Sequence, residues 1–293
     1  MVVHWDDVPW ETVDRGELRW ERQRLAPGLS RFRARPGARI MPAHVHVDEE
    51  EYVVVLAGAG LSWQDGAAYR IAAGDAVLHR PDAEVHTLIA GDGGLEVLIF
   101  GSGSTTGLTR LPRARVLRVG GGLWPPEVAD AFTCEPDLDV PEPSARRPPT
   151  IAALTDAPAD DEGVGRFTGV DRSVGDALGC VLSGLHLIDV PPGNVSCPAH
   201  WHTAEAEKFV VMEGGGEARL GDQRHPLRPG SVVVRPPNTG VEHALHAGEE
   251  GLRYLAWGTR DPRDICFYPD SGKVLIAQRV YRIEPLDYWD GEA

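Results

Sequence analysis

The stretch His44-Val-His46-Val-Asp-Glu-Glu-Glu51-Tyr-Val-Val-Val-Leu-Ala-Gly58 decides the fold, because the chain carries a second version of it. The second version reads His200-Trp-His202-Thr-Ala-Glu-Ala-Glu207-Lys-Phe-Val-Val-Met-Glu-Gly214 and keeps both histidines, the glutamate and the glycine at an offset of 156 residues. Each version follows a Pro-Gly pair, Pro36-Gly37 and Pro192-Gly193. A recurrence in register over this length indicates a tandem duplication.

A third histidine follows in each copy, after a glycine and a proline. It is His86 in the first copy and His243 in the second, where the offset of 157 is consistent with one inserted residue. Short β-branched runs such as 51–56 and 208–212, bounded by Gly, Pro or Asp, are typical of strands, and long amphipathic helical patterns are missing. We therefore expect an all-β protein built from barrels or sandwiches.

The two copies also set the expected domain boundaries. We expect an N-terminal barrel over 1–103, a linker over 104–150 and a C-terminal barrel over 151–293. The middle segment is rich in Pro, Gly and acidic residues, a composition typical of linkers. Its first part, Gly101-Ser-Gly103-Ser-Thr-Thr-Gly107, lacks the G-x-G-x-x-G spacing and a following helical pattern, so we assign it to the linker rather than to a phosphate-binding loop.

The repeated histidines have the spacing of metal ligands. Alternate side chains of a strand share a face, so His44 and His46 can chelate one ion, and a barrel can return His86 to them. Any single histidine would be better explained as a surface or core residue, but six histidines and two glutamates recur in register. Three imidazoles and a carboxylate suit Fe, Mn, Co, Ni or Zn and argue against Cu(I). The expected ligands, for up to two ions per chain, are His44, His46, Glu51 and His86, and His200, His202, Glu207 and His243.

Together with the following glycine and proline, these motifs resemble the two conserved motifs of the cupin superfamily, over roughly 29–101 and 185–258. The resemblance implies two tandem antiparallel jelly-roll barrels, each with a metal site. The second motif departs from the family pattern, since Gly74 to Pro81 is one residue longer than usual and Ala83 stands where the family has glycine. Glu50 is a rival to Glu51 as ligand, but Glu51 matches Glu207 in register, so we prefer Glu51.

Further polar residues near the motifs are candidates for catalytic roles. Glu49 and Glu205 recur at the same offset and are candidates for general bases or outer-shell acids, with solvated loop carboxylates as the alternative. His79, Arg235 and His246 are candidates for contacting a bound anion. The four cysteines form no C-x-x-C pair and are expected to be free thiols, with Cys197 the candidate for thiol chemistry.

The resemblance is specific for fold and metal, and much less so for reaction. Two-domain cupins of this appearance include oxalate decarboxylases, oxalate oxidases and ring-cleaving or carbonyl-cleaving dioxygenases. The run 200–207 is similar to the oxalate-degrading type, but the chain is shorter and shows no identifiable acidic lid. The runs 258–264 and 268–270 are similar to bacterial cupin-domain proteins, a likeness that implies no reaction.

We therefore expect a metal-dependent enzyme acting on a small molecule, foremost an oxidoreductase of the dioxygenase type with Fe or Mn. One alternative is a non-redox lyase, decarboxylase or isomerase acting on a sugar or an organic acid. The other is a metal-dependent protein that binds or senses a small ligand.

The net charge of the chain disfavours two classes of binding partner. A net charge of −15 would repel nucleic acid and anionic membranes, and the N-terminal residues form no secretory signal, so we expect a cytoplasmic protein. The aromatic residues Trp5, Trp10 and Trp20 and the tail 286–289 are expected to pack across domains or subunits, and a homodimer is a further expectation.

Overall fold

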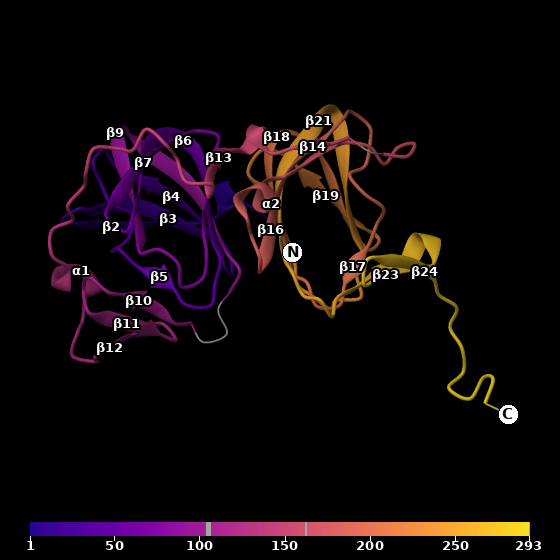
Figure 1. Cartoon of the computed structure of the whole chain (residues 1–293). Coiled ribbons are helices and arrows are strands. Elements are labelled where there is room, and N and C mark those ends of the chain that lie inside the picture. Colours follow the sequence, from indigo (N-terminus) through magenta and orange to yellow (C-terminus); the bar gives the residue numbers. More distant parts are fainter. Residues whose placement is uncertain (104–106, 162, 293) are drawn as a thin grey trace. The chain divides into compact units, whose positions relative to one another are not determined.

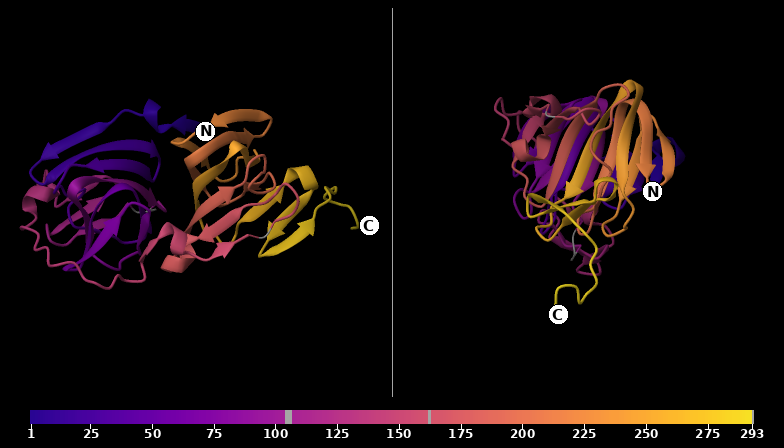
Figure 2. Two further views of the ribbon diagram at one scale, coloured as in Figure 1. Left: turned by 90° about the horizontal axis from the view of Figure 1, so that it is seen from above. Right: turned by 90° about the vertical axis from the view of Figure 1, so that its right-hand side faces the viewer.

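A computed structural model describes residues 1–103, 107–161 and 163–292. The chain divides into two compact units (Figures 1 and 2). The N-terminal unit comprises Val3–Ala159 and Arg172–Leu187, and the C-terminal unit comprises Met1–Val2, Asp160–Asp171 and Ile188–Ala293. Each unit is a barrel of antiparallel strands, so the expected all-β class is confirmed.

The N-terminal unit is built from two sheets. The larger has the order β13-β8-β6-β9-β4-β3-β2 with β7 paired to β6, and the smaller has the order β5-β10-β11-β12. The bounds are β2 Glu11–Arg15, β3 Leu18–Ala26, β4 Leu29–Ala34, β5 Val45–His46, β6 Glu51–Gln64, β7 Ala67–Ala72, β8 Asp75–His79, β9 His86–Gly101, β10 Thr109–Leu111, β11 Val116–Val119, β12 Gly122–Trp124 and β13 Ile151–Ala153.

The C-terminal unit repeats this plan. Its larger sheet contains the order β20-β18-β21 with β19 paired to β18, and its smaller sheet has the order β17-β22-β23-β24. The bounds are β17 Trp201–His202, β18 Glu207–Leu220, β19 Gln223–Leu227, β20 Ser231–Arg235, β21 His243–Thr259, β22 Ile265–Tyr268, β23 Lys273–Ile276 and β24 Arg279–Arg282. The remaining elements are β1 Val2–His4, α1 Ala131–Cys134, β14 Ala159–Asp160, β15 Val170–Ser173, α2 Val174–Leu178 and β16 Ser183–Val190, besides three short 3₁₀ turns.

Each barrel has its own apolar core. In the N-terminal unit, inward side chains of β6 and β9 such as Val53 and Val97 pack with Trp20 and Phe32, whose rings meet edge to face at 5.3 Å. In the C-terminal unit, Phe209 and Tyr254 lie in the apolar core, where their rings contact each other. Burial of these β-branched and aromatic side chains on the strand faces stabilises each barrel independently.

The duplication extends beyond the expected end of the first barrel. β10 pairs with β5 and places Thr109 opposite His46, just as β22 pairs with β17 and places Cys266 opposite His202. Residues 109–124 are therefore strands of the N-terminal unit rather than linker, because the two-residue strand β5 needs a neighbour for its backbone groups. Within the run 101–107, residues 104–106 lie outside the described residues. The segment 172–187, expected in the second barrel, also belongs to the N-terminal unit.

The aromatic residues at the two ends of the chain have different surroundings. Trp20 lies in the N-terminal core, and Trp5 and Trp10 lie within the N-terminal unit over the guanidinium groups of arginines. In the tail, Tyr288 and Trp289 are exposed and contact each other. Of the described helices, none has the length and apolar character that a bilayer span requires.

Gly58 on β6 is a position where only glycine fits. Its φ is +77°, and a Cβ built there would lie 2.2 Å from the carbonyl oxygen of Gly94. Gly58→Ala is expected to lower the free energy of unfolding by about 3 kcal/mol, because it adds a clash to a strained backbone. Urea denaturation measures this loss. Gly66→Ala is the control, since its φ is +85° but its Cβ would meet nothing within 4 Å; equal losses for both variants would show that the clash contributes nothing.

Candidate metal centres

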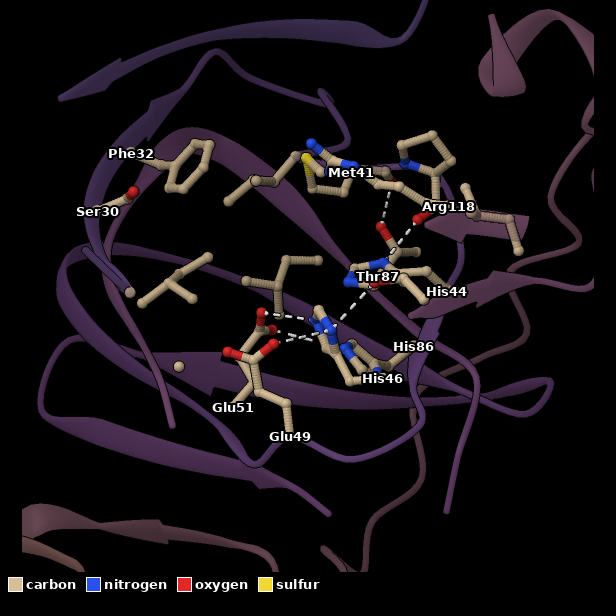
Figure 3. A pocket seen from close by; sticks show the side chains of 18 residues that line it. Ser30, Phe32, Met41, His44, His46, Glu49, Glu51, His86, Thr87 and Arg118 are labelled. Atoms are coloured by element: carbon tan, nitrogen blue, oxygen red, sulfur yellow. Dashed lines mark hydrogen bonds and ion pairs between the residues drawn. The ribbon is translucent and has the colours of Figure 1, made fainter. Parts of the chain in front are cut away.

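The N-terminal cluster, defined as His44, His46, Glu51 and His86, forms where three strands begin or end. His46 ends β5, Glu51 begins β6 and His86 begins β9. His44 is held beside His86 by paired backbone hydrogen bonds of 3.0 and 2.8 Å. One ligand atom from each of the four residues lies within 4.8 Å of all the others. Figure 3 shows the imidazoles and the carboxylate turned toward a common space.

Hydrogen bonds on the outer ring nitrogens orient these imidazoles. His44 Nδ1 lies 2.8 Å from the Pro42 carbonyl and His86 Nδ1 lies 3.0 Å from the Glu84 carbonyl. A carbonyl only accepts, so each Nδ1 carries the proton and each Nε2 is left as a free lone pair. Across the cluster, Glu51 approaches His46 Nε2 at 3.3 Å and His86 Nε2 at 3.5 Å.

Electrostatics favour the metal-binding forms of His44 and Glu51, whereas at His46 the lowering of the pKa by burial is outweighed by Glu51 and Glu49, which raise it. Burial, reinforced by the charges of His86 and His46, holds the pKa of His44 well below its ordinary value, so this ring stays neutral. Burial alone would raise the pKa of Glu51, but hydrogen bonds to His46 and His86 outweigh it and keep that pKa well below the usual range. A neutral imidazole and an ionised carboxylate are the protonation states that coordinate a cation.

A cavity of about 190 Å³ opens over the N-terminal cluster. Besides the four cluster residues, its polar lining includes Glu49 and Arg118 (Figure 3). Its walls are otherwise mainly apolar, formed by Phe32, Ile40, Met41, Pro42, Leu88, Ile99 and Leu111. A concave apolar site with a few convergent polar groups is the usual form of a small-molecule site.

The C-terminal cluster, defined as His200, His202, Glu207 and His243, has the same strand origins. Glu207 approaches His243 Nε2 at 3.0 Å and His202 Nε2 at 3.8 Å. His200, Glu207 and His243 have ligand atoms within 4.8 Å of one another, and His200 and His202 form a second such group with Cys266. Glu207 therefore contacts all three histidines, but the four residues do not form a single group within 4.8 Å as the N-terminal four do, and a thiol lies beside two of the histidines.

One outer nitrogen of the C-terminal cluster, that of His202, has a carboxylate as its partner. His202 Nδ1 lies 2.6 Å from Asp264 Oδ2, and His200 Nδ1 lies 2.8 Å from the Pro198 carbonyl. Burial lowers the pKa of His202, but Cys266, Glu207 and Asp264 outweigh it and raise that pKa to about 9. The protonated His202 ring must lose a proton before it can bind a metal ion. The affinity of the C-terminal cluster for metal should therefore increase as the pH rises toward 9.

Asp264 is a partner of His202 that can be tested directly. Its other oxygen accepts hydrogen bonds from the backbone N–H groups of Ala204 and Glu205, which holds the carboxylate in place. Asp264→Asn is expected to weaken metal binding at the C-terminal cluster by about 10- to 100-fold and to leave the N-terminal cluster unchanged. Competition with a metal-binding dye measures both affinities. Asp261→Asn is the control, because Asp261 pairs with Arg263 rather than a histidine; an equal effect there would contradict the role of Asp264.

The two candidate glutamates lie beside their clusters. Glu49 contacts His46 Nδ1 at 3.4 Å and lines the cavity, and its other oxygen accepts from Gly103 N–H at 3.0 Å. Glu205 lies 3.8 Å from His202 Nδ1, and burial raises its pKa. Both are close enough to act on a bound ligand or on the orientation of a histidine.

The anion-contact candidates are placed differently from expectation. His79 stacks on the His86 ring at 3.6 Å, binds Glu84 and does not line the cavity; burial lowers its pKa to about 4. Arg235, at the matching place in the other unit, is buried and donates to Thr239. His246 lines a separate cavity of about 250 Å³, to which none of the C-terminal cluster residues contributes. His79 is therefore outside the N-terminal cavity and His246 outside the C-terminal cluster, whereas Arg235 lies opposite Glu207 in the pairing of β20 with β18.

Glu50 and Cys197 also have definite places. Glu50 is fully buried away from the cluster and accepts hydrogen bonds from Val181 and Ser183. Cys197 Sγ lies 3.7 Å from the outer nitrogen of His200, and the structure joins none of the four cysteines in a disulfide.

The residues present fit a metal ion. In the described structure His86 Nε2 and both ring nitrogens of His243 are buried and make no hydrogen bond, although the two Nε2 atoms face the carboxylates of Glu51 and Glu207 at 3.5 and 3.0 Å. A buried polar atom without a partner is costly, and coordination would satisfy the nitrogens that face the cluster centres. Three nitrogen donors and a carboxylate suit Fe, Mn, Co, Ni and Zn.

Several residues at the sites were missed in the sequence. Asp264 and Cys266 reach the C-terminal cluster, and Thr109 and Arg118 reach the N-terminal one. The 157-residue offset, continued past Gly101, aligns Thr109 with Cys266. The sequence around these two positions contains no repeated histidine that would mark the alignment.

Comparisons with known proteins agree with this architecture. The cupin domain family model matches residues 30–101 and 186–258. Oxalate decarboxylase from Bacillus subtilis at pH 4.6 is similar in structure, with a TM-score of 0.57 and 19% identity over 88% of this chain and 75% of that one. Another structure of that enzyme comes from a study of its Mn(II) centres. It has a TM-score of 0.57 and 18% sequence identity over 88% of this chain and 76% of that one.

A putative sugar phosphate isomerase from Acidithiobacillus ferrooxidans is 30% identical over 42% of this chain and 83% of that one, with a TM-score of 0.38. No curated protein matches the chain. The family match covers the motif region of each copy, and the structural likeness extends over both barrels. The chain is therefore a two-domain member of the cupin superfamily.

Proposed function

We propose that the protein is a metal-dependent oxidoreductase that acts on a small organic molecule at the N-terminal cluster, with Fe or Mn as the metal. The observation that carries the proposal is the position of three imidazoles and one carboxylate beside an apolar cavity of about 190 Å³. Four protein ligands leave open positions on an octahedral ion, and Fe and Mn accept this ligand set. A bound ion of this kind would supply electron transfer and Lewis acidity toward a substrate.

The residues of the cavity have separable roles in this proposal. The apolar walls exclude water from the substrate. Glu49 lies next to His46 and within the cavity, where its carboxylate can hold or take up a proton from a substrate. Arg118 brings a guanidinium group to the lining and would bind a substrate carboxylate.

Arg118 also favours one form of the non-redox alternative. A guanidinium group matches a carboxylate better than a neutral sugar, so a lyase or decarboxylase at this site would act on an organic acid. Oxygen use separates the two functions, because only the oxidoreductase of the dioxygenase type consumes it.

The test begins with protein purified without a metal-chelating step. Metal content is measured, and oxygen uptake is then followed with a panel of small carboxylic acids. Uptake that depends on Fe or Mn supports the proposal, and turnover with Zn or Ni and no oxygen use would favour the lyase. Arg118→Gln should raise KM about 10-fold or more, whereas the neighbouring Arg115→Gln, outside the cavity lining, should not. Bound metal without turnover of any acid would leave the ligand-binding alternative.

A further inference from the structure

Cys266 occupies a position in the C-terminal unit that has no thiol counterpart in the N-terminal unit. Strand β22 pairs with β17 so that Cys266 lies directly opposite His202, and in the other unit Thr109 lies directly opposite His46. Directly opposed residues of an antiparallel pair project to the same face. The thiol of Cys266 therefore shares a face with a histidine of the C-terminal cluster.

The distances place this thiol beside two of the four ligands of the C-terminal cluster. Cys266 Sγ and one ring nitrogen each of His200 and His202 lie within 4.8 Å of one another. Cys266 is 2% exposed and free of any disulfide, so its sulfur is enclosed in the unit. A further sign of a bound ion in this cluster is His243, which is 1% exposed and makes no hydrogen bond through either ring nitrogen, while its Nε2 faces the Glu207 carboxylate at 3.0 Å.

We infer that Cys266 is a thiolate ligand of the C-terminal cluster, which makes this cluster a mixed sulfur, nitrogen and oxygen site for Zn²⁺ or a similar borderline cation. On binding, the S–H proton is released to solvent and the sulfur lone pair is donated to the cation. The N-terminal cluster, with Thr109 at the matching position, remains a nitrogen and oxygen site that suits Mn²⁺ or Fe²⁺. One chain would thus hold two chemically different centres.

The surroundings of the C-terminal cluster agree with a closed site. Where Leu111 and Arg118 line the N-terminal cavity, the repeat places Tyr268 and Leu275. The Tyr268 ring lies 5.7 Å from the His200 ring, and the guanidinium group has no equivalent. A zinc site that includes cysteine among its ligands is common in structural roles. This inference concerns the C-terminal cluster and is independent of the reaction proposed for the N-terminal one.

The test is cobalt spectroscopy on the full chain. His46→Ala is used as the parent protein, so that cobalt occupies the C-terminal cluster. Thiolate-to-cobalt charge transfer gives intense near-ultraviolet absorption, which imidazole and carboxylate ligands do not give. The parent is expected to show this absorption. Adding Cys266→Ser or Cys266→Thr should remove it and leave only the weak visible bands of bound cobalt.

Matched controls make each outcome decisive. Cys197→Ser removes a thiol that faces the outer nitrogen of His200, and it should keep the absorption. Cys266→Thr introduces the residue that the other unit carries at this position, so the substitution is expected to be compatible with the fold. Thermal unfolding of the metal-free variant measures whether its stability is unchanged. Three results would overturn the inference: a parent that binds no cobalt, a parent without the charge-transfer absorption, or absorption that survives loss of Cys266.

Discussion

His46→Ala and His202→Ala are each expected to remove about one of about two equivalents of bound metal, without affecting the other cluster. Each substitution deletes an imidazole and leaves the remaining ligands with an incomplete set. The loss in affinity should exceed the roughly 10- to 100-fold typical of removing an outer partner. Elemental analysis of the purified variants measures it, and activity assigned to the N-terminal cluster should disappear in His46→Ala alone.

The control for both variants is His225→Ala. His225 lies on β19, away from either cluster, so its removal should leave the metal content unchanged. Metal content that is insensitive to both cluster variants would refute the assignment of these residues as ligands. Equal loss from the control would point to a general effect on folding.

Glu50→Ala is expected to lower the free energy of unfolding by about 3 kcal/mol. The Glu50 carboxylate is 0% exposed and accepts hydrogen bonds from Val181 N–H at 2.5 Å, Ser183 N–H at 2.9 Å and Ser183 Oγ–H at 2.8 Å. Alanine would leave these donors without partners, and Ser183 is itself fully buried. Urea denaturation measures the loss.

The metal content of Glu50→Ala separates its role from that of its neighbour. Because Glu50 lies away from the N-terminal cluster, the folded variant should retain its metal, whereas Glu51→Ala should lose it. Glu127→Ala, at an exposed position of the same unit, should change the stability by no more than about 0.5 kcal/mol. A small effect of Glu50→Ala on stability would mean that water replaces the carboxylate.

The adjacent residues Glu50 and Glu51 are thus assigned different roles, Glu50 in stability and Glu51 in metal binding. The sequence predicts only the role of Glu51. The register with Glu207 selects Glu51 as the residue that joins the histidines. It does not predict that Glu50 binds residues 181–183, more than a hundred positions away, because nothing local marks that pairing. The same limit explains why the segment 172–187 was expected in the second barrel.

The sequence alone determined the duplication, the all-β class and the eight clustered histidines and glutamates. These follow from local patterns: strand periodicity, H-x-H spacing and a constant offset between copies. Only the tertiary structure decided which residues surround the clusters. Asp264 and Cys266 reach His202, and Arg118 reaches the N-terminal cavity, through strand pairings whose register is set by packing of the whole barrel. The difference between the two centres therefore lies in cross-strand neighbours, which the shared motif does not contain.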